Sequence, residues 1–221
     1  MNYSKDDAVK IVVACAEKYK AELENKNLLF ICIDKHKKSS YIEFAFHDYN
    51  YMHLTGLKGA HELRRGASRP DGGASDEELT ATDFYKRCLE HKLSTNDFVF
   101  ADDGTTPMKL DVLPFIICKN LAANMVGSFN SPHPKLYTEK VAGGERAYVG
   151  FVKDSLSGEY VPNTVVKEDL RKSVSDYVRI ILAYRKEQKD EKYTERVYIA
   201  RKVDWSKIKF PEEFAYLPKP E

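Results

Sequence analysis

The sequence predicts an α+β protein in which N-terminal helices pack on an antiparallel sheet. The first half contains stretches whose apolar residues recur at helical spacing, whereas the part after residue 125 consists of short runs rich in β-branched and aromatic residues. Apolar residues make up 43% and charged residues 31% of the chain, which is typical of an ordered globular protein. At 221 residues, the chain is long enough to form one domain with a substantial core.

Residues 4–24 are predicted to form the first helix. Ser4 followed by Asp7 three positions later fits an N-terminal cap. The apolar residues that fall on one face of this helix are Ala8, Val12, Cys15, Tyr19 and Leu23. We expect this face to cover the sheet.

A β-hairpin is predicted next. The first strand reads "NLLFICID", and the second, "SSYIEFAFHDY", places Tyr41, Glu43, Ala45 and His47 opposite Ile42, Phe44 and Phe46. The connecting stretch "DKHKKSS" is short and polar, as a hairpin turn requires. His47 belongs to this alternation, so we interpret it as part of one strand face.

Residues 59–78 are rich in Gly, Ala, Ser and charge, which predicts a mobile surface loop. Arg64, Arg65 and Arg69 leave two interpretations open, an ordinary connector or a loop that orders over a polyanion. A helix is predicted over residues 79–93, with Thr80 and Asp83 as its cap. Another helix is predicted after Thr106-Pro107, and Pro114 should kink or restart it.

The last part of the chain is predicted to form an antiparallel sheet. Its β-rich runs are separated by Gly, Pro, Asn and Ser, and they read "MVGSFN", "KLYTEK", "RAYVGFVKD", "EYVPNTVV", "YVRIILAYRK" and "KYTERVYIARK". This completes the α+β pattern.

The N-terminus, the length of the apolar runs and the cysteine spacing predict a cytoplasmic protein. The N-terminus lacks a small-residue cleavage site, and no apolar run is long enough to span a bilayer. Cys15, Cys32, Cys88 and Cys118 lie far apart in apolar surroundings, without a C-x-x-C pair. We therefore expect buried thiols in a reducing cytoplasm and no membrane partner.

Several kinds of site are absent from the sequence. There is no HExxH, C-x-x-C or DxDxDG pattern for a metal, and neither a GxGxxG nor a GxxxxGK[ST] loop for a nucleotide. The G-x-S-x-G motif of hydrolases is missing as well. We therefore expect no metal and no cofactor.

Two clusters of polar residues remain. His53 follows the aromatic strand and precedes Thr55-Gly56, where a loop would present its imidazole for proton transfer, but composition alone favours a histidine that caps the strand end through a backbone hydrogen bond. In "YVPNTVVKEDLRK", Pro162 should break the strand. Lys167 and Arg171 would then share one face of a helical turn and hold an anion, or merely balance nearby acidic residues.

Five motifs in order resemble one family. They read "YMHLTGLK" at 51–58, "TDFYKRCLEHKLS" at 82–94, "MVGSFN" at 125–130, "YVGFVKD" at 148–154 and "YVPNTVVKEDLR" at 160–171. The chain resembles the phage-associated barnase/EndoU/colicin/RelE-like (BECR) nucleases, and in particular their fourth subgroup, over a core of about residues 25–187. An N-terminal helix and a C-terminal strand and tail extend this core within a single domain of residues 1–221.

The resemblance implies a BECR-like nuclease fold whose concave sheet face holds the site. It also implies metal-independent cleavage of RNA, in which a ribose 2′-hydroxyl attacks the adjacent phosphorus. It makes His53, Thr55 and Lys167 the expected catalytic residues, with His53 as general acid or base and Thr55 as a donor to it or to the phosphate. Lys58, Asn163, Thr164 and Arg171 become the expected substrate-binding residues.

The expected partner is RNA, with a cognate inhibitor or a host protein as further candidates. Tyr49, Tyr51 and Tyr137 are available to stack on bases, although tyrosines of a β-rich protein more often serve in packing. The net charge of only +1 supports a second hypothesis, a non-catalytic binding or inhibitory protein of a mobile element built on a nuclease-like scaffold. An enzyme with another substrate, such as a nucleotide-modifying transferase, is the third.

Overall fold

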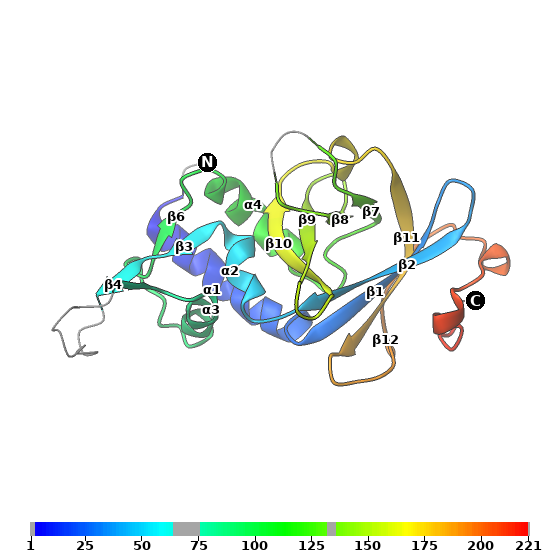
Figure 1. Cartoon of the computed structure of the whole chain (residues 1–221), viewed down its shortest axis with the longest axis horizontal. Helices are drawn as coiled ribbons and strands as arrows, with labels where there is room; N and C mark the ends of the chain where they lie inside the picture. The colour runs from blue at the N-terminus through cyan, green and yellow to red at the C-terminus, as the bar shows by residue number, and fades with distance from the viewer. Residues whose placement is uncertain (1–2, 64–75, 132–135, 221) are drawn as a thin grey trace.

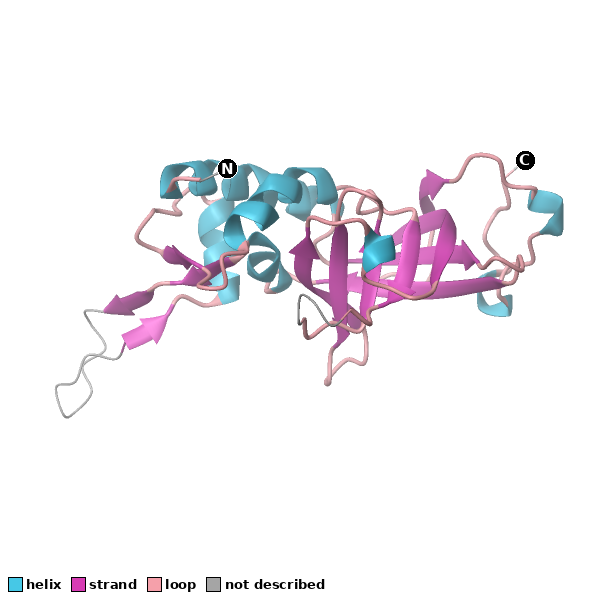
Figure 2. Cartoon of the chain, turned by 90° about the horizontal axis from the view of Figure 1, so that it is seen from above, coloured by secondary structure: helices cyan, strands magenta, loops and turns pink. Residues whose placement is uncertain are grey.

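The structure is a computed structural model that describes residues 3–63, 76–131 and 136–220. It confirms the predicted α+β class: helices gather at one end of a curled antiparallel sheet (Figures 1 and 2). The helices are α1 (Lys5–Glu22), α2 (Asn50–Thr55), α3 (Ala81–Leu89) and α4 (Thr106–Ile116), and the 3-10 turns are η1 (Leu170–Lys172), η2 (Trp205–Lys207) and η3 (Glu212–Phe214).

The main sheet has eight strands, all antiparallel, in the order β10-β9-β8-β7-β11-β1-β2, with β12 paired to β11. Its strands are β1 (Lys26–Ile33), β2 (Ser39–Phe46), β7 (Met125–Ser128), β8 (Lys140–Gly143), β9 (Tyr148–Lys153), β10 (Tyr160–Val166), β11 (Tyr177–Glu187) and β12 (Glu195–Ile199). The predicted N-terminal hairpin therefore joins the C-terminal strands in one sheet, through the pairing of β1 with β11.

Two small ladders lie outside the main sheet. They consist of β3 (Leu57–Gly59) with β6 (Phe98–Phe100), and of β4 (His61–Leu63) with β5 (Asp76–Glu78). The segment 59–78, predicted to be a mobile loop, thus contains strands at both ends. Arg64, Arg65 and Arg69, on which the polyanion interpretation depends, lie outside the described residues.

Helix α1 begins as the sequence predicts. The hydroxyl of Ser4 accepts a hydrogen bond from the backbone N–H of Asp7, and the Asp7 carboxylate accepts one from the Ser4 backbone, which forms a complete capping box. The predicted apolar face is buried, and Tyr19 at its centre contacts the rings of Phe46 and Tyr51. The helix therefore packs on β2 and on α2.

The sheet curls strongly enough to bring its two ends together. Phe44 on β2 stacks on Phe151 of β9, with ring centroids 3.8 Å apart, although these strands stand near opposite ends of the strand order. Alternate residues of β1 face opposite sides: Leu28 and Phe30 join the core beneath the helices, whereas Leu29 and Ile31 pack with the C-terminal residues Phe214 and Leu217. The C-terminal segment thus covers the outer face of the sheet.

Three local predictions need correction. The run "KLYTEK" was expected to be a strand, but β8 begins only at its last residue, Lys140. Pro162 does not break a strand: β10 continues through it with a bulge between Pro162 and Thr164, which an edge strand tolerates because no neighbour needs the missing N–H. Helix α4 contains Pro114 without restarting and ends two residues later at Ile116.

Three of the four cysteines lie in the interior. Cys15, Cys32 and Cys88 are buried as predicted, while Cys118 is partly exposed. Among the helices in the described ranges, none is long and apolar enough to cross a membrane.

Candidate active site where α2, α4 and β10 meet

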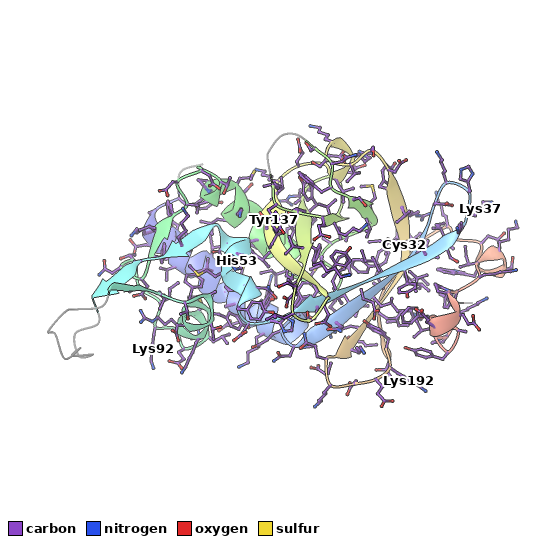
Figure 3. All side chains as sticks on the ribbon, in the orientation of Figure 1. Cys32, Lys37, His53, Lys92, Tyr137 and Lys192 are labelled. Carbon is purple, nitrogen blue, oxygen red and sulfur yellow. The ribbon has the colours of Figure 1, made fainter. Side chains whose placement is uncertain are left out.

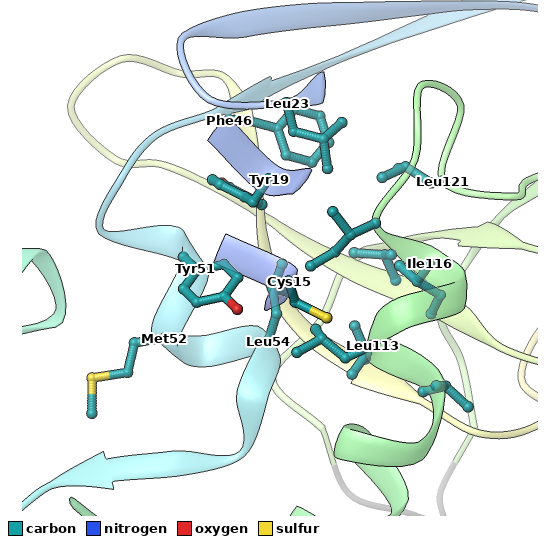
Figure 4. Packing of buried hydrophobic residues seen from close by; sticks show 14 of the residues in the cluster. Cys15, Tyr19, Leu23, Phe46, Tyr51, Met52, Leu54, Leu113, Ile116 and Leu121 are labelled. Atoms are coloured by element: carbon teal, nitrogen blue, oxygen red, sulfur yellow. The ribbon is translucent and has the colours of Figure 1, made fainter. Parts of the chain in front are cut away.

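His53 stands on helix α2 and not in the loop that the sequence predicted. The helix turns its apolar residues inward, and Figure 4 shows Tyr51 and Leu54 facing Cys15 of α1 and Leu113 of α4. His53 lies on the opposite, exposed side (Figure 3). Because the buried face anchors the helix, the imidazole is held at the surface by a packed element.

Thr55 ends this helix. Its hydroxyl is fully buried, donates a hydrogen bond to the backbone carbonyl of Met52 at 2.7 Å and accepts one from the backbone N–H of Leu57 at 3.1 Å. A buried hydroxyl with both roles filled does not reach a phosphate. The structure therefore places Thr55 in the support of α2, which corrects its expected role as a direct donor to the substrate.

Gly56 follows α2 directly and is the residue against which the start of α4 packs. It adopts the left-handed conformation, with φ of 73°, and its carbonyl accepts hydrogen bonds from the Thr106 hydroxyl and from the backbone N–H of Ala101. A Cβ atom at this position would lie 2.9 Å from Cδ of Lys109 and 3.0 Å from Cα of Thr106. Glycine is thus needed both for the turn and for the close approach of α4.

Lys109 is a site residue that the sequence analysis missed. Its ammonium nitrogen donates a hydrogen bond of 3.4 Å to the backbone carbonyl of His53, and its charge lies near enough to the imidazole to lower the pKa of His53. Partial burial lowers the pKa of Lys109, an effect that the Asp103 carboxylate opposes. The sequence offers no local signal for this pairing, since 56 residues separate the two positions.

The pKa of His53 is lowered from its ordinary value of 6.5. Desolvation is the larger cause, because the ring stands against the packed surface although its edge reaches solvent, and repulsion by the Lys109 ammonium is the smaller one. Both effects disfavour the imidazolium. At neutral pH the ring is therefore uncharged and able to accept a proton.

A pocket of about 280 Å³ opens beside this pair. Its lining comes from α4, from the residues just before it and from β10 with the turn that follows, and includes Met108, Lys109, Leu136, Thr164 and Lys167. A neighbouring hollow shares Met108 and Lys167. Lys109, which contacts the backbone of His53, therefore lines the same pocket as Lys167.

Lys167 follows the end of β10 and forms an ion pair with Asp111 of α4. Asp111 also accepts a hydrogen bond of 3.4 Å from the Tyr3 hydroxyl. The pKa of the Asp111 carboxyl is lowered, chiefly by its hydrogen bond with Lys167. The cation is half-exposed and lines the pocket, but an incoming phosphate has to compete with this carboxylate.

Arg171 and Lys167 do not share the expected helical turn, since η1 starts only at Leu170. The Arg171 guanidinium is held by Asp169, at 2.6 Å, and by Glu145, at 3.1 Å. The pocket is lined by Lys167 and Glu168 but not by Arg171, within the part of the chain that the structure describes. The geometry brings Lys167 to the site and leaves Arg171 outside its lining.

The other expected substrate-binding residues take different places. Thr164 is buried and lines the pocket. Asn163 is occupied by its neighbours, since its amide donates to the Tyr137 carbonyl and accepts from the Thr138 hydroxyl at 3.1 Å. Lys58, on β3, forms an exposed ion pair with Asp102 at 3.0 Å.

The three tyrosines proposed as stacking platforms are not equivalent. Tyr51 is fully buried and donates its hydroxyl to the backbone of α1, so it cannot stack on a base. Tyr49 is partly exposed and already stacks on His47, with centroids 5.1 Å apart. Tyr137 is 87% exposed and lies near β10 (Figure 3). Only Tyr137 offers an open ring close to the pocket.

Two further observations define the chemistry available. No group of three or more His, Cys, Asp or Glu side chains is placed to hold a metal ion within residues 3–63, 76–131 and 136–220. Lys109, Lys167 and the hydroxyl-bearing Thr164 line one pocket instead, and Lys109 also contacts the backbone of His53. This set can accept a proton and stabilise a negatively charged group.

A family model described as phage-Barnase-EndoU-ColicinE5/D-RelE like nuclease4 (PBECR4) matches residues 11–202. The match starts within α1 and extends beyond β12, so it includes every strand of the main sheet. No curated protein and no solved structure matches the chain.

Proposed function

Because this chain belongs to the phage-Barnase-EndoU-ColicinE5/D-RelE like nuclease4 family, we propose that it is a metal-independent endoribonuclease acting at the α2–α4–β10 pocket. The observation that carries the proposal is the contact of Lys109 with His53 beside a pocket that Lys109 and Lys167 both line. A proton acceptor and two cations are the groups that cleavage by a ribose 2′-hydroxyl requires.

In the proposed reaction, neutral His53 accepts the proton of the 2′-hydroxyl while its oxygen forms a bond with the adjacent phosphorus. The bond from phosphorus to the 5′-oxygen breaks, and that oxygen takes a proton from the Lys109 ammonium. The lowered pKa of Lys109 favours this donation. The products are a 2′,3′-cyclic phosphate and a 5′-hydroxyl.

Lys167 has the role of holding the phosphoryl oxygens as their negative charge grows. It must exchange part of its pairing with Asp111 for the phosphate, which its half-exposed position permits. Thr55 and Gly56 are positioning residues: the first closes the end of α2, and the second lets Lys109 approach. Thr164 forms part of the pocket wall.

The test is cleavage of an end-labelled RNA by the full chain in excess chelator. We expect cleavage by the wild-type protein and a loss of at least a hundredfold in His53→Ala, the range of general acid–base catalysis. His91→Ala is the matched control, because the His91 imidazole is exposed and pairs with Glu17 of α1 at 3.0 Å. No cleavage, cleavage that stops when metal is removed, or an active His53→Ala would refute the proposal.

One observation favours the alternative, a non-catalytic binding or inhibitory protein. Lys167 and Arg171 are both paired with carboxylates and are not poised for a phosphate. That alternative predicts a stoichiometric inhibitor or host protein that co-purifies with the chain and still binds the His53→Ala variant. Loss of RNA cleavage in His53→Ala, measured on the same preparation, would rule the alternative out.

A further inference from the structure

A second hollow, of about 400 Å³, is lined by residues of the β1–β2 hairpin, which points away from α2 in Figure 1. It opens between the β1–β2 turn and strands β7, β8 and β11. Residues that line it are Cys32, Asp34, Lys35, Ser40, Tyr41, Ile42, Val126, Gly127, Ser128, Lys140, Asp176, Tyr177 and Val178. None of them belongs to the pocket beside His53.

The strands supply an apolar floor. Cys32 and Val126 are buried and Ile42 and Val178 half-buried, and all four belong to or pack against the cluster that fills the inside of the curl. Val126 pairs directly with Val178 across β7 and β11. Such a floor suits the flat, weakly polar face of a nucleobase.

The rim carries two lysines, Lys140 and Lys35, that have no carboxylate partner in the described part of the chain. Lys140 donates to the Ser128 hydroxyl at 2.8 Å, and neither Lys140 nor Lys35 has a carboxylate within 4.0 Å among the residues whose placement is given. Asp34, also on the rim, is engaged by the backbone N–H groups of His36 and Lys38, each at 2.8 Å. Lys167 and Arg171 differ from these two lysines, because each forms an ion pair with a carboxylate that a phosphate would have to displace.

The charges around this hollow favour one path for a bound RNA chain. A neighbouring hollow along the edge of β2 shares Tyr41 and Ile42 with this one and carries the carboxylates Glu43 and Glu159. On the other side, the turn after Asp34 reads "KHKK" (residues 35–38). A phosphodiester chain is repelled by the carboxylates of Glu43 and Glu159 and attracted by the basic turn at residues 35–38.

We propose that this hollow binds one nucleotide of single-stranded RNA, with the base on the apolar floor and the phosphate between Lys140 and Lys35. The proposal rests on RNA being the substrate and adds a contact away from the point of cleavage. The chain would continue over the turn at residues 35–38. This hollow is referred to as the distal nucleotide site.

The test uses binding of a fluorescent 2′-O-methyl oligoribonucleotide, which lacks the attacking hydroxyl and is not cleaved. In the whole chain, Lys35→Gln with Lys140→Gln should weaken binding about tenfold at low salt and reduce the slope of log affinity against log salt by about 0.7, the value for one phosphate contact on a single strand. Lys18→Gln with Lys20→Gln removes the same charge from the exposed face of α1 and should change neither quantity.

A second arm replaces the oligonucleotide by one with an abasic residue at each position in turn. Loss of affinity at one position supports a base on the floor, whereas equal binding throughout would overturn that part and leave only a charged surface. An unchanged affinity and salt slope in the Lys35/Lys140 variant would overturn the whole distal nucleotide site. Wild-type protein that binds the oligonucleotide through these lysines but cleaves no RNA would refute the proposed nuclease alone; wild-type protein that binds none refutes both.

Discussion

The ammonium nitrogen of Lys109 donates a hydrogen bond of 3.4 Å to the backbone carbonyl of His53. This contact connects the helix that carries the imidazole with the helix that lines the pocket. It also places a positive charge next to a histidine whose pKa is already lowered by desolvation. The first predictions follow from this pair of residues.

Activity should depend on pH through His53. A general base works when neutral, so kcat/KM should rise with pH and reach half its plateau below 6.5, because the pKa of His53 is lowered from that value. Lys109→Gln removes the charge that repels the imidazolium, so the pKa of His53 should move up, toward 6.5 but not past it, since desolvation remains. NMR titration of the His53 ring, assigned with His53→Ala, measures this without relying on activity.

Lys119→Gln is the control for this titration, since Lys119 is exposed and faces Glu195. It should leave the pKa of His53 unchanged. A His53 ring that titrates above 6.5 in the wild type, or that ignores Lys109→Gln, would contradict the proposed arrangement.

Gly56→Ala should destabilise the protein and disturb the site. The left-handed backbone costs a non-glycine residue about 1 kcal/mol, and the added methyl group would clash with Cα of Thr106 and with the stem of Lys109, for a total of about 2–3 kcal/mol. Gly104→Ala separates the two effects: Gly104 also has a positive φ, of 70°, but a Cβ atom there meets nothing within 4 Å. Urea unfolding should show a loss of about 1 kcal/mol for Gly104→Ala, and equal losses for both variants would contradict the packing argument.

Lys167→Gln should lower kcat/KM about tenfold to a hundredfold, because a cation facing the growing charge of the phosphoryl group is lost. Lys172→Gln removes a nearby and more exposed lysine that faces Glu168 at 3.9 Å and should have little effect. Asp111→Asn offers the opposite change, since it leaves the Lys167 ammonium without its carboxylate and should lower KM for RNA. Steady-state kinetics measures all three variants. Wild-type values of kcat/KM for Lys167→Gln and of KM for Asp111→Asn would contradict the role of Lys167.

The thiols should differ in reactivity. Burial raises the pKa of Cys15 to about 11 and those of Cys32 and Cys88 to about 12, so each remains a protonated, inaccessible thiol at neutral pH. Cys118 is partly exposed. A thiol reagent added to the native protein should modify Cys118 first, and Cys118→Ser should abolish the fast phase seen by mass spectrometry. Modification of Cys15, Cys32 or Cys88 as fast as that of Cys118 would contradict this order of reactivity.

Patterns that are local in sequence predicted most elements correctly. Ser4 and Asp7 form a capping box, and Thr80 accepts from the backbone N–H of Asp83 at 3.1 Å, because a cap depends on residues three positions apart. The alternation in residues 39–46 predicted β2 for a similar reason. The insertion of β1 between β2 and β11 was not predicted, since strand order depends on contacts across the whole chain.

The site residues also differ in whether local sequence could predict them. His53 and Lys167 were proposed from their motifs; Lys167 lines the pocket, and His53 contacts Lys109, which lines it too. Lys109 was missed, because its place depends on Gly56 letting α4 approach α2 from far along the chain. Thr55 looked like a reactive hydroxyl beside a histidine, but tertiary packing turned it inward, where the end of α2 uses both its hydrogen bonds.

The role of the 2′-hydroxyl is tested most directly with one RNA that carries a single 2′-deoxynucleotide at a mapped cleavage position, incubated with the protein in excess chelator. Attack by the 2′-hydroxyl with His53 as base predicts a 2′,3′-cyclic phosphate at unmodified positions and no product at the deoxy position. Cleavage at the deoxy position, or products bearing 5′-phosphates, would contradict this mechanism.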